Sequence, residues 1–177
     1  MSDGASAMRV NDVETTSEGL FLPRVFQVAY VTRNLPKAQA LLEQRFGISR
    51  WQHMRDMENK PGTFVTLANA RVGDMAVEII EVGDVGEGGE TIWHQLPLLE
   101  GEVMRFHHFG HIYYTPEEWD RVVAGVEKEG VKVAERASFG DLIDFIYVDE
   151  RAMLGHWIEY IYCMPAGRAL FAEFPAN

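Results

Sequence analysis

The sequence repeats itself at an interval of 81 residues, and this repeat constrains the fold more than any other feature of the chain. Two aromatic and β-branched stretches, FVTLA and FIYVD, align at that interval. So do two pairs of polar residues, Gln27 with His108 and Glu78 with Glu159. Self-similarity at a fixed spacing indicates one supersecondary unit that was built twice. The chain is therefore predicted to fold as two related halves.

The first half shows a strand, a helix and three more strands. β-Branched and aromatic residues predict the first strand at 25–31. An apolar helical face follows between Asn34, which is suited to an N-cap, and Gly47, which ends the pattern. Three further strands are expected, at 49–54, 63–70 and 75–82.

The second half repeats this order. A strand is predicted at 107–114, and Thr115 and Glu118 then form the pattern of a capping box, with Pro116 at the first helical position and Gly130 at the end. The remaining strands are expected at 131–136, 142–148 and 156–163. The predicted fold class is α+β, with two βαβββ modules in tandem forming one pseudo-symmetric domain.

This pattern predicts one domain over residues 23–163, flanked by two tails. We expect a mobile N-terminal tail at 1–22, module one at 24–82, a linker or flap at 83–104, module two at 105–163, and a C-terminal tail at 164–177. The segment 83–104 is glycine-rich and acidic and then carries the apolar patch TIWHQLPLLE. It is either a linker that packs on the core through Ile92, Trp93 and Leu96 or a flap over a site. Leu170, Phe171 and Phe174 are expected to dock the C-terminal tail.

The charge and the cysteine content exclude several classes of partner. A formal net charge of −11 repels phosphate backbones and anionic lipids, so we expect no nucleic-acid or membrane partner. Cys163 is the only cysteine, which excludes an internal disulfide and a thiolate zinc site. Residues 1–20 contain no apolar run typical of a signal peptide. We therefore expect a cytoplasmic protein. As a separate expectation, the protein is a homodimer that acts on a small-molecule carbonyl substrate.

The repeat also predicts a site. If the halves pack as pseudo-symmetric copies, Gln27, Glu78, His108 and Glu159 converge on one point. His107 and His111 stand an odd number of residues from His108, and alternate strand residues face opposite sides, so at most one of these two sets can face a given cavity. We choose His108, because it alone aligns with Gln27 at the interval that also relates the two glutamates.

The same alternation directs Glu81 and His156 outward. Inward carboxylates on strands such as VEII and WIEY are costly to bury unpaired, and a divalent cation compensates them. The alternative is that the two glutamates pair with arginine or bind buried water.

The residues that carry this pattern resemble a known superfamily. The duplicated modules, the opening FQVAYVTRNLPKAQALLEQRFGI, the motif HHFG and the late motif GHWIEY are similar to the vicinal oxygen chelate superfamily. That superfamily includes glyoxalase I, methylmalonyl-CoA epimerase, extradiol dioxygenases and bleomycin-resistance proteins. The resemblance covers about residues 24–163 and is specific for the fold and the metal positions. It favours a glyoxalase-like or methylmalonyl-CoA-epimerase-like branch.

The resemblance implies a metal site and a reaction. The metal ligands would be Gln27, Glu78, His108 and Glu159, holding one divalent ion: Zn, Ni, Co, Mn or Fe. The implied function is a metal-dependent isomerase, epimerase or lyase that removes a proton next to a carbonyl and stabilises the enediolate on the metal. Glu159 is the first candidate for the catalytic base and Glu78 the second.

Departures from the family pattern limit the substrate and keep two alternatives open. The positions that match the glutathione clamp of glyoxalase I carry Val31, Val82 and Met104, so that clamp is absent. One alternative function is a metal-free protein that binds a small hydrophobic molecule in a cup lined by aromatic residues: Trp51, Trp93, Trp157, Tyr113 and Tyr147. An extradiol dioxygenase is less favoured, because it needs a second histidine that only His53 or His94 could supply.

Overall fold

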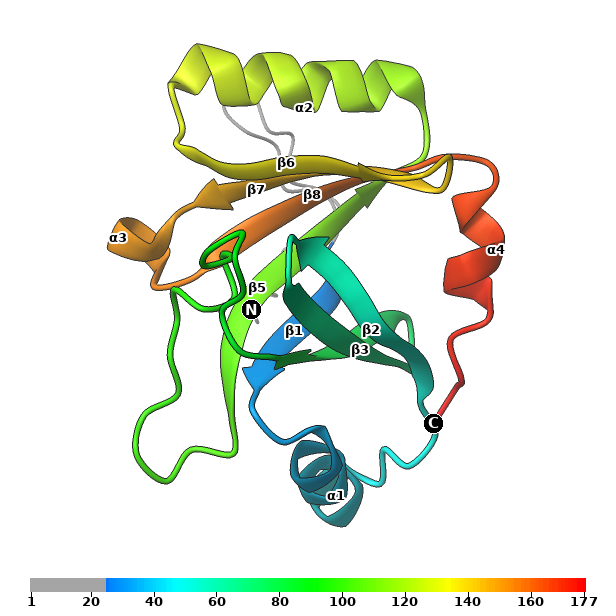
Figure 1. The fold of residues 1–177 in the computed structure, drawn as a ribbon. Helices are drawn as coiled ribbons and strands as arrows, with labels where there is room; N and C mark the ends of the chain where they lie inside the picture. The colour runs from blue at the N-terminus through cyan, green and yellow to red at the C-terminus, as the bar shows by residue number, and fades with distance from the viewer. Residues whose placement is uncertain (1–24) are drawn as a thin grey trace, which may run out of the picture.

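The fold is one curled sheet of eight strands with helices on its outer side (Figure 1). A computed structural model describes residues 25–177, and the expected tail at 1–22 lies outside this range. The elements of the first half are β1 (Val25–Thr32), α1 (Leu35–Phe46), β2 (Gln52–Lys60), β3 (Thr63–Val72) and β4 (Met75–Val82). Those of the second half are β5 (Met104–Tyr113), α2 (Pro116–Glu129), β6 (Val133–Phe139), β7 (Ile143–Asp149) and β8 (Trp157–Cys163), with α3 (Arg151–Leu154) before β8 and α4 (Gly167–Ala172) after it.

The strand order shows the predicted duplication directly. The order is β2-β3-β4-β1-β5-β8-β7-β6, with β1 and β5 antiparallel at the centre. On either side the pairing is equivalent, because β1 runs parallel to β4 and β5 runs parallel to β8. The two βαβββ modules therefore join through β1 and β5 into one continuous sheet, which confirms the predicted fold class.

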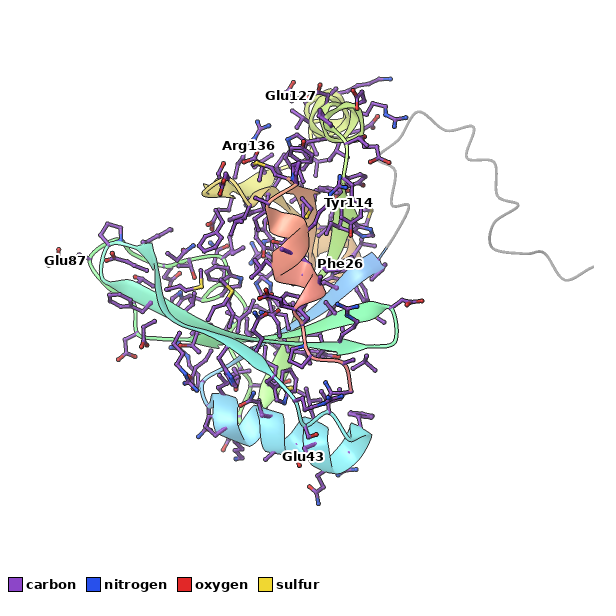
Figure 2. All side chains as sticks on the ribbon, turned by 90° about the vertical axis from the view of Figure 1, so that its right-hand side faces the viewer. Phe26, Glu43, Glu87, Tyr114, Glu127 and Arg136 are labelled. Atoms are coloured by element: carbon purple, nitrogen blue, oxygen red, sulfur yellow. The ribbon has the colours of Figure 1, made fainter. Side chains whose placement is uncertain are left out.

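Alternation along the strands sends successive side chains to opposite faces of the sheet. On β4, Val77 and Ile79 pack in the apolar cluster under α1, whereas Ile80 and Val82 belong to a second cluster on the concave face. On the other module, Tyr160 lies in the cluster under α2. Figure 2 shows the two helices outside the sheet at opposite ends of the molecule, which leaves the concave face to the site.

Both long helices begin and end where the sequence predicts. The Asn34 side chain accepts a hydrogen bond from the Lys37 N–H at 2.9 Å, and Gly47 follows the last turn with φ of 74°. Thr115 and Glu118 form the expected capping box, and Gly130 ends α2 with φ of 63°. These caps satisfy orphan backbone groups at the helix ends and so fix where each module turns back to its sheet.

Strand bounds were predicted less well at one edge of the sheet. The strand expected at 49–54 is in fact β2 at Gln52–Lys60, so the sequence RDMENK at 55–60 was missed. β2 is an edge strand, and edge strands carry charged residues that oppose pairing with other chains. Charges on both faces remove the alternation by which a strand is recognised.

The two connecting segments pack against the core. Ile92 and Trp93 are buried in the concave cluster and Leu96 packs against it, as expected of a linker. The C-terminal segment contains α4 and is tied to β3 by Arg71, whose guanidinium donates to the carbonyls of Phe171 and Ala172. No helix within residues 25–177 is long and apolar enough to cross a membrane.

Candidate functional site

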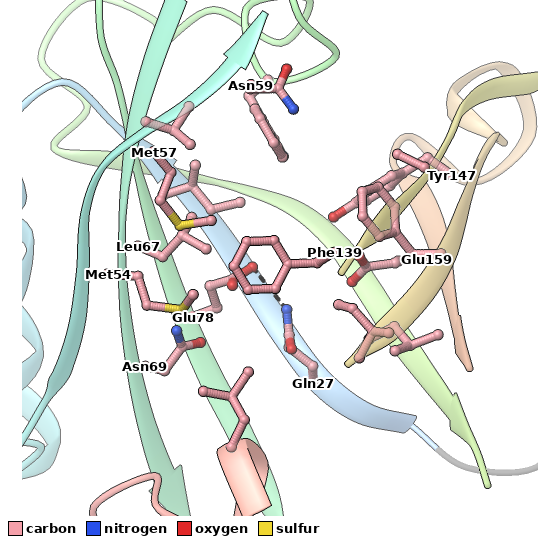
Figure 3. A pocket seen from close by; sticks show the side chains of 18 of the residues that line it. Gln27, Met54, Met57, Asn59, Leu67, Asn69, Glu78, Phe139, Tyr147 and Glu159 are labelled. Carbon is pink, nitrogen blue, oxygen red and sulfur yellow. Dashed lines mark hydrogen bonds between the residues drawn. The ribbon is translucent and has the colours of Figure 1, made fainter. Parts of the chain in front are cut away.

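The four side chains predicted from the repeat meet at the centre of the concave face, and Figure 3 shows three of them, Gln27, Glu78 and Glu159. Gln27 Nε2 donates to Glu78 Oε2 at 2.8 Å and lies 3.4 Å from His108 Nε2. His108 Nε2 lies 3.2 Å from Glu159 Oε2 and 3.9 Å from Glu78 Oε2. All four residues are buried, with His108 fully enclosed. The structure thus brings together every residue of the predicted set.

The register of the central strands explains this convergence. Ala29 on β1 stands between Glu78 and His108, and Gly110 on β5 stands between Gln27 and Glu159. These two small residues give the larger side chains room to lean toward each other. A Cβ atom at Gly110 would lie 3.0 Å from Gln27 Cβ and 3.4 Å from Glu159 Oε2, so the glycine of HHFG is required by close packing.

His107 lies beside His108, although the two are successive residues of one strand. The pairing of β1 with β5 shifts between Ala29 and Tyr30, whose partners are His108 and Phe106. This bulge leaves His107 as an extra residue and interrupts the alternation on which the prediction depended. His107 is fully buried, stacks on Trp157 at 4.4 Å and places its Nδ1 at 2.8 Å from His108 Nδ1.

The contacts of His107 fix which nitrogen of a neutral His108 carries the proton. Burial and the neighbouring His108 lower the pKa of His107 well below its usual range, so His107 is neutral. Its Nε2 lies 3.4 Å from the Ile92 carbonyl, which can only accept, so Nε2 carries the proton and Nδ1 is the acceptor. His108 Nδ1 must then donate to it, and the Nε2 lone pair of His108 faces the glutamates.

The two glutamates have different surroundings. Burial, together with the charge of Glu159, raises the pKa of the Glu78 carboxyl to about 8. Glu159 instead accepts from the hydroxyl of Tyr147, whose own pKa is raised well above its usual range by burial and by both glutamates. Sequence reasoning named Tyr147 only as an aromatic wall. Its alignment with the polar Thr66 at the same interval of 81 residues was the available signal.

The donor set fits a divalent cation in chemistry and in spacing. The His108 lone pair and the carboxylate oxygens are all acceptors, and acceptors 3.2 Å apart need a proton or a cation between them. Ligands at about 2.0–2.2 Å from one ion stand roughly 3.0–3.5 Å apart, close to the contacts observed. Within residues 25–177 no three His, Cys, Asp or Glu side chains are already arranged as metal ligands. To bind a metal with all four residues, the Glu78 carboxylate would have to move closer to His108 Nε2, which is 3.9 Å away. The Gln27 amide would also have to turn its oxygen, instead of its nitrogen, toward the cluster.

A cavity of about 270 Å³ opens above the cluster. Gln27, Glu78 and Glu159 form its floor, and both modules and the C-terminal segment supply its walls. The apolar wall residues include Met54, Met57, Leu67, Phe139, Phe145, Phe171 and Phe174. The expected docking of the C-terminal tail thus has a consequence for the site, because Phe171 and Phe174 close one end of the cavity.

Several residues considered from sequence lie elsewhere. Of the five aromatic residues expected to form a cup, Trp93 and Tyr147 line the cavity, but Trp51 packs on the α1 side, Tyr113 on the α2 side and Trp157 beneath His107.

The two histidines considered for a dioxygenase are also remote from the cluster. His53 contacts Gln39 on the surface, and His94 bonds to Thr91 and to the Gly83 carbonyl. Neither can serve as a second histidine ligand. Glu81 is confirmed as pointing away from the cavity, since it accepts from the Leu35 N–H of α1.

Comparison with known proteins agrees with this geometry. Residues 26–147, more than half of the chain, match the family model of the glyoxalase/bleomycin resistance protein/dioxygenase superfamily. The chain belongs to this superfamily. The resemblance inferred from HHFG, GHWIEY and the duplicated modules is thereby confirmed, as is the vicinal oxygen chelate fold. No curated protein matches the sequence.

Solved structures resemble the chain in fold. Methylmalonyl-CoA epimerase from Mycobacterium tuberculosis superposes with a TM-score of 0.59 at 11% identity, over 88% of this chain and 97% of the epimerase. A hypothetical protein from Bacillus halodurans gives a TM-score of 0.57 at 14% identity, covering 78% and 93%. A variant epimerase from Streptomyces coelicolor in complex with 2-nitronate-propionyl-CoA gives 0.55 at 12% identity, covering 81% and 99%. At these identities the likeness shows the fold alone.

Proposed function

We propose that this member of the superfamily is a metal-dependent isomerase, epimerase or lyase that removes a proton from a carbon next to a carbonyl. The observation that carries the proposal is the meeting of the His108 lone pair with two carboxyls and an amide at the floor of a cavity. Such a set of acceptors is suited to a divalent ion, and the cavity above it has room for a small substrate. Superfamily membership supports the reaction class.

The chain's own residues supply the proton transfers. Glu159 is the proposed base, because it lines the cavity and the Tyr147 hydroxyl, which donates a hydrogen bond to it, holds the carboxyl in place. Glu78 lines the opposite side and holds its proton near neutral pH in the metal-free protein, so it is placed to return a proton from that side. A positioned acid or base contributes roughly 10² to 10⁴ in rate. Two carboxyls facing one substrate can therefore remove a proton and replace it elsewhere.

The proposed ligands of the ion are Gln27, Glu78, His108 and Glu159. When bound, a divalent ion would act as a Lewis acid toward the substrate oxygens and stabilise negative charge that develops there. His107 would keep His108 in the tautomer whose Nε2 can bind, through the 2.8 Å contact between their Nδ1 atoms. Zinc, nickel, cobalt, manganese and iron are all compatible with this set of donors.

Two variants test the proposal by separating metal binding from proton transfer. Glu159→Gln keeps the size and one oxygen ligand but removes the basicity. It should retain metal while deuterium uptake from solvent at the substrate carbon falls at least roughly 10²-fold. His108→Ala should lose metal and activity together. Metal content after dialysis and the rate of deuterium exchange are the measurements, with Glu81→Gln as the control on the outer side of β4.

If Glu159→Gln exchanged deuterium at the wild-type rate and contained the normal amount of metal, Glu78 would become the candidate for the base. Full activity in metal-free wild type, unchanged by chelators, would contradict the metalloenzyme altogether.

A metal-free binding protein is the second candidate. The apolar walls of the cavity favour it, and so does the Gln27 amide, which already donates to Glu78 and bridges toward His108. In that case the cluster would serve as a polar floor under a hydrophobic ligand. Binding of ligand with equal affinity before and after removal of metal, without deuterium exchange, is the result that this candidate predicts.

A further inference from the structure

The cavity contains a buried polar side chain that the proposed reaction does not use. Asn69 on β3 is 2% exposed, and its Oδ1 atom has no hydrogen-bond partner among the described residues. Asn69 pairs directly with Glu78 across β3 and β4, so both side chains point to the concave face. Figure 3 shows the amide at the cavity wall on the side of Met54. A buried acceptor without a partner is unfavourable, which indicates that a ligand supplies the donor.

The charges around the cavity exclude an anionic substrate. None of the residues that line it, all within 25–177, is lysine or arginine. Apart from the two glutamates of the cluster, the charged residues of the lining are Glu58 and Glu135, both acidic. The overall charge of −11 acts in the same direction. In the metal-free protein a carboxylate or phosphate carried by the substrate would therefore meet acidic side chains and no basic one.

The walls also limit the size of the substrate. The cavity holds about 270 Å³, below the roughly 300–1,000 Å³ usual for drug-sized ligands. Phe171 and Phe174 contact each other with ring centroids 5.4 Å apart and close the end nearest the C-terminus. Arg71 holds this segment through the carbonyls of Phe171 and Ala172. The space suits one ring-sized apolar group rather than a long carrier.

We propose that the substrate is a small uncharged α-hydroxycarbonyl compound with an apolar, ring-sized tail, and that Asn69 selects it by accepting a hydrogen bond from the hydroxyl group. The inference rests on the proposed function and names the substrate class of that site. Glu159 takes the proton from the carbon that bears the hydroxyl, and the electrons of the C–H bond form the enediolate. The hydroxyl proton then passes through Glu78 or solvent to the former carbonyl oxygen, and return of a proton to the former carbonyl carbon gives the isomeric α-hydroxycarbonyl. The isomerisation therefore needs no oxidant or reductant.

Three small aromatic compounds test the substrate class: 2-hydroxyacetophenone, acetophenone, which lacks the hydroxyl, and phenylglyoxylate, which carries a carboxylate. Binding to the metal-free full chain is followed by tryptophan fluorescence, because Trp93 lines the cavity. The hydroxyl should strengthen binding about tenfold, the value of one good hydrogen bond. Phenylglyoxylate should bind more weakly than both ketones. Equal or tighter binding of phenylglyoxylate would overturn the inference.

Asn69→Leu tests the residue, because it keeps the size and removes the acceptor. The tenfold preference should disappear in this variant and in Asn69→Ala, whose thermal melts show whether each is folded. Asn59→Leu is the comparison variant. Asn59 also lines the cavity, and its Oδ1 likewise has no hydrogen-bond partner among the described residues, while its amide nitrogen donates to Glu135 at 3.4 Å. A preference that survives both changes at Asn69, or that is lost equally in Asn59→Leu, would show that Asn69 does not select the hydroxyl.

Deuterium exchange into 2-hydroxyacetophenone by the zinc-loaded protein separates this inference from the proposed function. The exchange measures proton abstraction, whereas the binding preference of the metal-free protein measures only recognition by Asn69. Exchange without an Asn69-dependent preference would overturn the inference and keep the function. If the protein prefers the hydroxyl compound through Asn69 but exchanges no deuterium, recognition by Asn69 is supported and the proposed reaction is contradicted.

Discussion

The buried Glu78 carboxyl should make the stability of the metal-free protein fall as pH rises above neutrality. Its pKa is about 8 in the folded chain against 4.5 in the ordinary state. Between these values the folded chain keeps a proton that the unfolded chain has lost, so the free energy of unfolding decreases with pH. The stabilisation is complete below pH 4.5 and is lost as pH rises through 8.

His107 acts in the opposite direction over part of this range. Its pKa lies well below 6.5 in the folded chain, so below pH 6.5 the unfolded chain binds a proton that the folded chain does not. This raises stability with pH up to about 6.5 and offsets the effect of Glu78 there. From pH 6.5 to 8 the effect of Glu78 is therefore the larger one. One pKa unit corresponds to about 1.4 kcal/mol, so the loss over this window is on the order of 1–2 kcal/mol.

Urea unfolding of metal-stripped protein at pH 6.5, 7, 7.5 and 8 measures this loss. Glu78→Gln should flatten the profile, because an amide does not titrate, whereas Glu81→Gln on the same strand should keep the wild-type decrease. A decrease of about 1–2 kcal/mol corresponds to roughly 2–8 °C in melting temperature for a chain of this size. A wild-type profile that stays level or rises from pH 6.5 to 8, in parallel with Glu78→Gln, would refute the raised pKa.

Three further outcomes are expected from the same geometry. Gly110→Ala should lower the free energy of unfolding by about 1–3 kcal/mol in urea titrations and weaken metal binding, because the new Cβ lies 3.0 Å from Gln27 Cβ. His107→Phe should reduce zinc affinity in metal titrations by roughly 10–100-fold through loss of the acceptor for His108, while His107→Gln, which keeps an acceptor, should restore much of it. The hemithioacetal of methylglyoxal and glutathione should be turned over poorly in a glyoxalase assay, because the matching clamp positions carry apolar side chains; robust turnover would contradict this.

The duplicated sequence predicted the centre of the site because every ligand position lies on one of the four central strands, β1, β4, β5 and β8. A fixed interval of 81 residues preserves the register of β1 with β4 and of β5 with β8, so equivalent residues face the same point. The alternation of side chains along each strand then predicted which residues face the cavity. On β4, Glu78 lines the cavity and Glu81 points to the opposite side, toward α1. Local patterns of this kind are readable without tertiary information.

The parts that were missed depend on contacts that no local pattern encodes. The bulge at His107 is a property of the pairing between β1 and β5 and leaves no mark on the sequence HHFG. The role of Phe171 and Phe174 follows from the path of the chain after β8, where the segment returns to β3. The homodimer and the cytoplasmic location stay predictions.

The differences between the two modules explain how a duplicated scaffold can hold two unlike carboxyls. Glu78 and Glu159 occupy equivalent positions, but Tyr147 stands where the first module has Thr66. The Thr66 hydroxyl accepts from the Asp56 N–H at the sheet edge, whereas the Tyr147 hydroxyl reaches Glu159. That hydrogen bond distinguishes Glu159 from Glu78, whose pKa is raised to about 8 by burial and by the charge of Glu159. Tyr147→Phe should therefore lower deuterium exchange without removing the ligands of the metal, and an unchanged exchange rate would show that the division of roles has another cause.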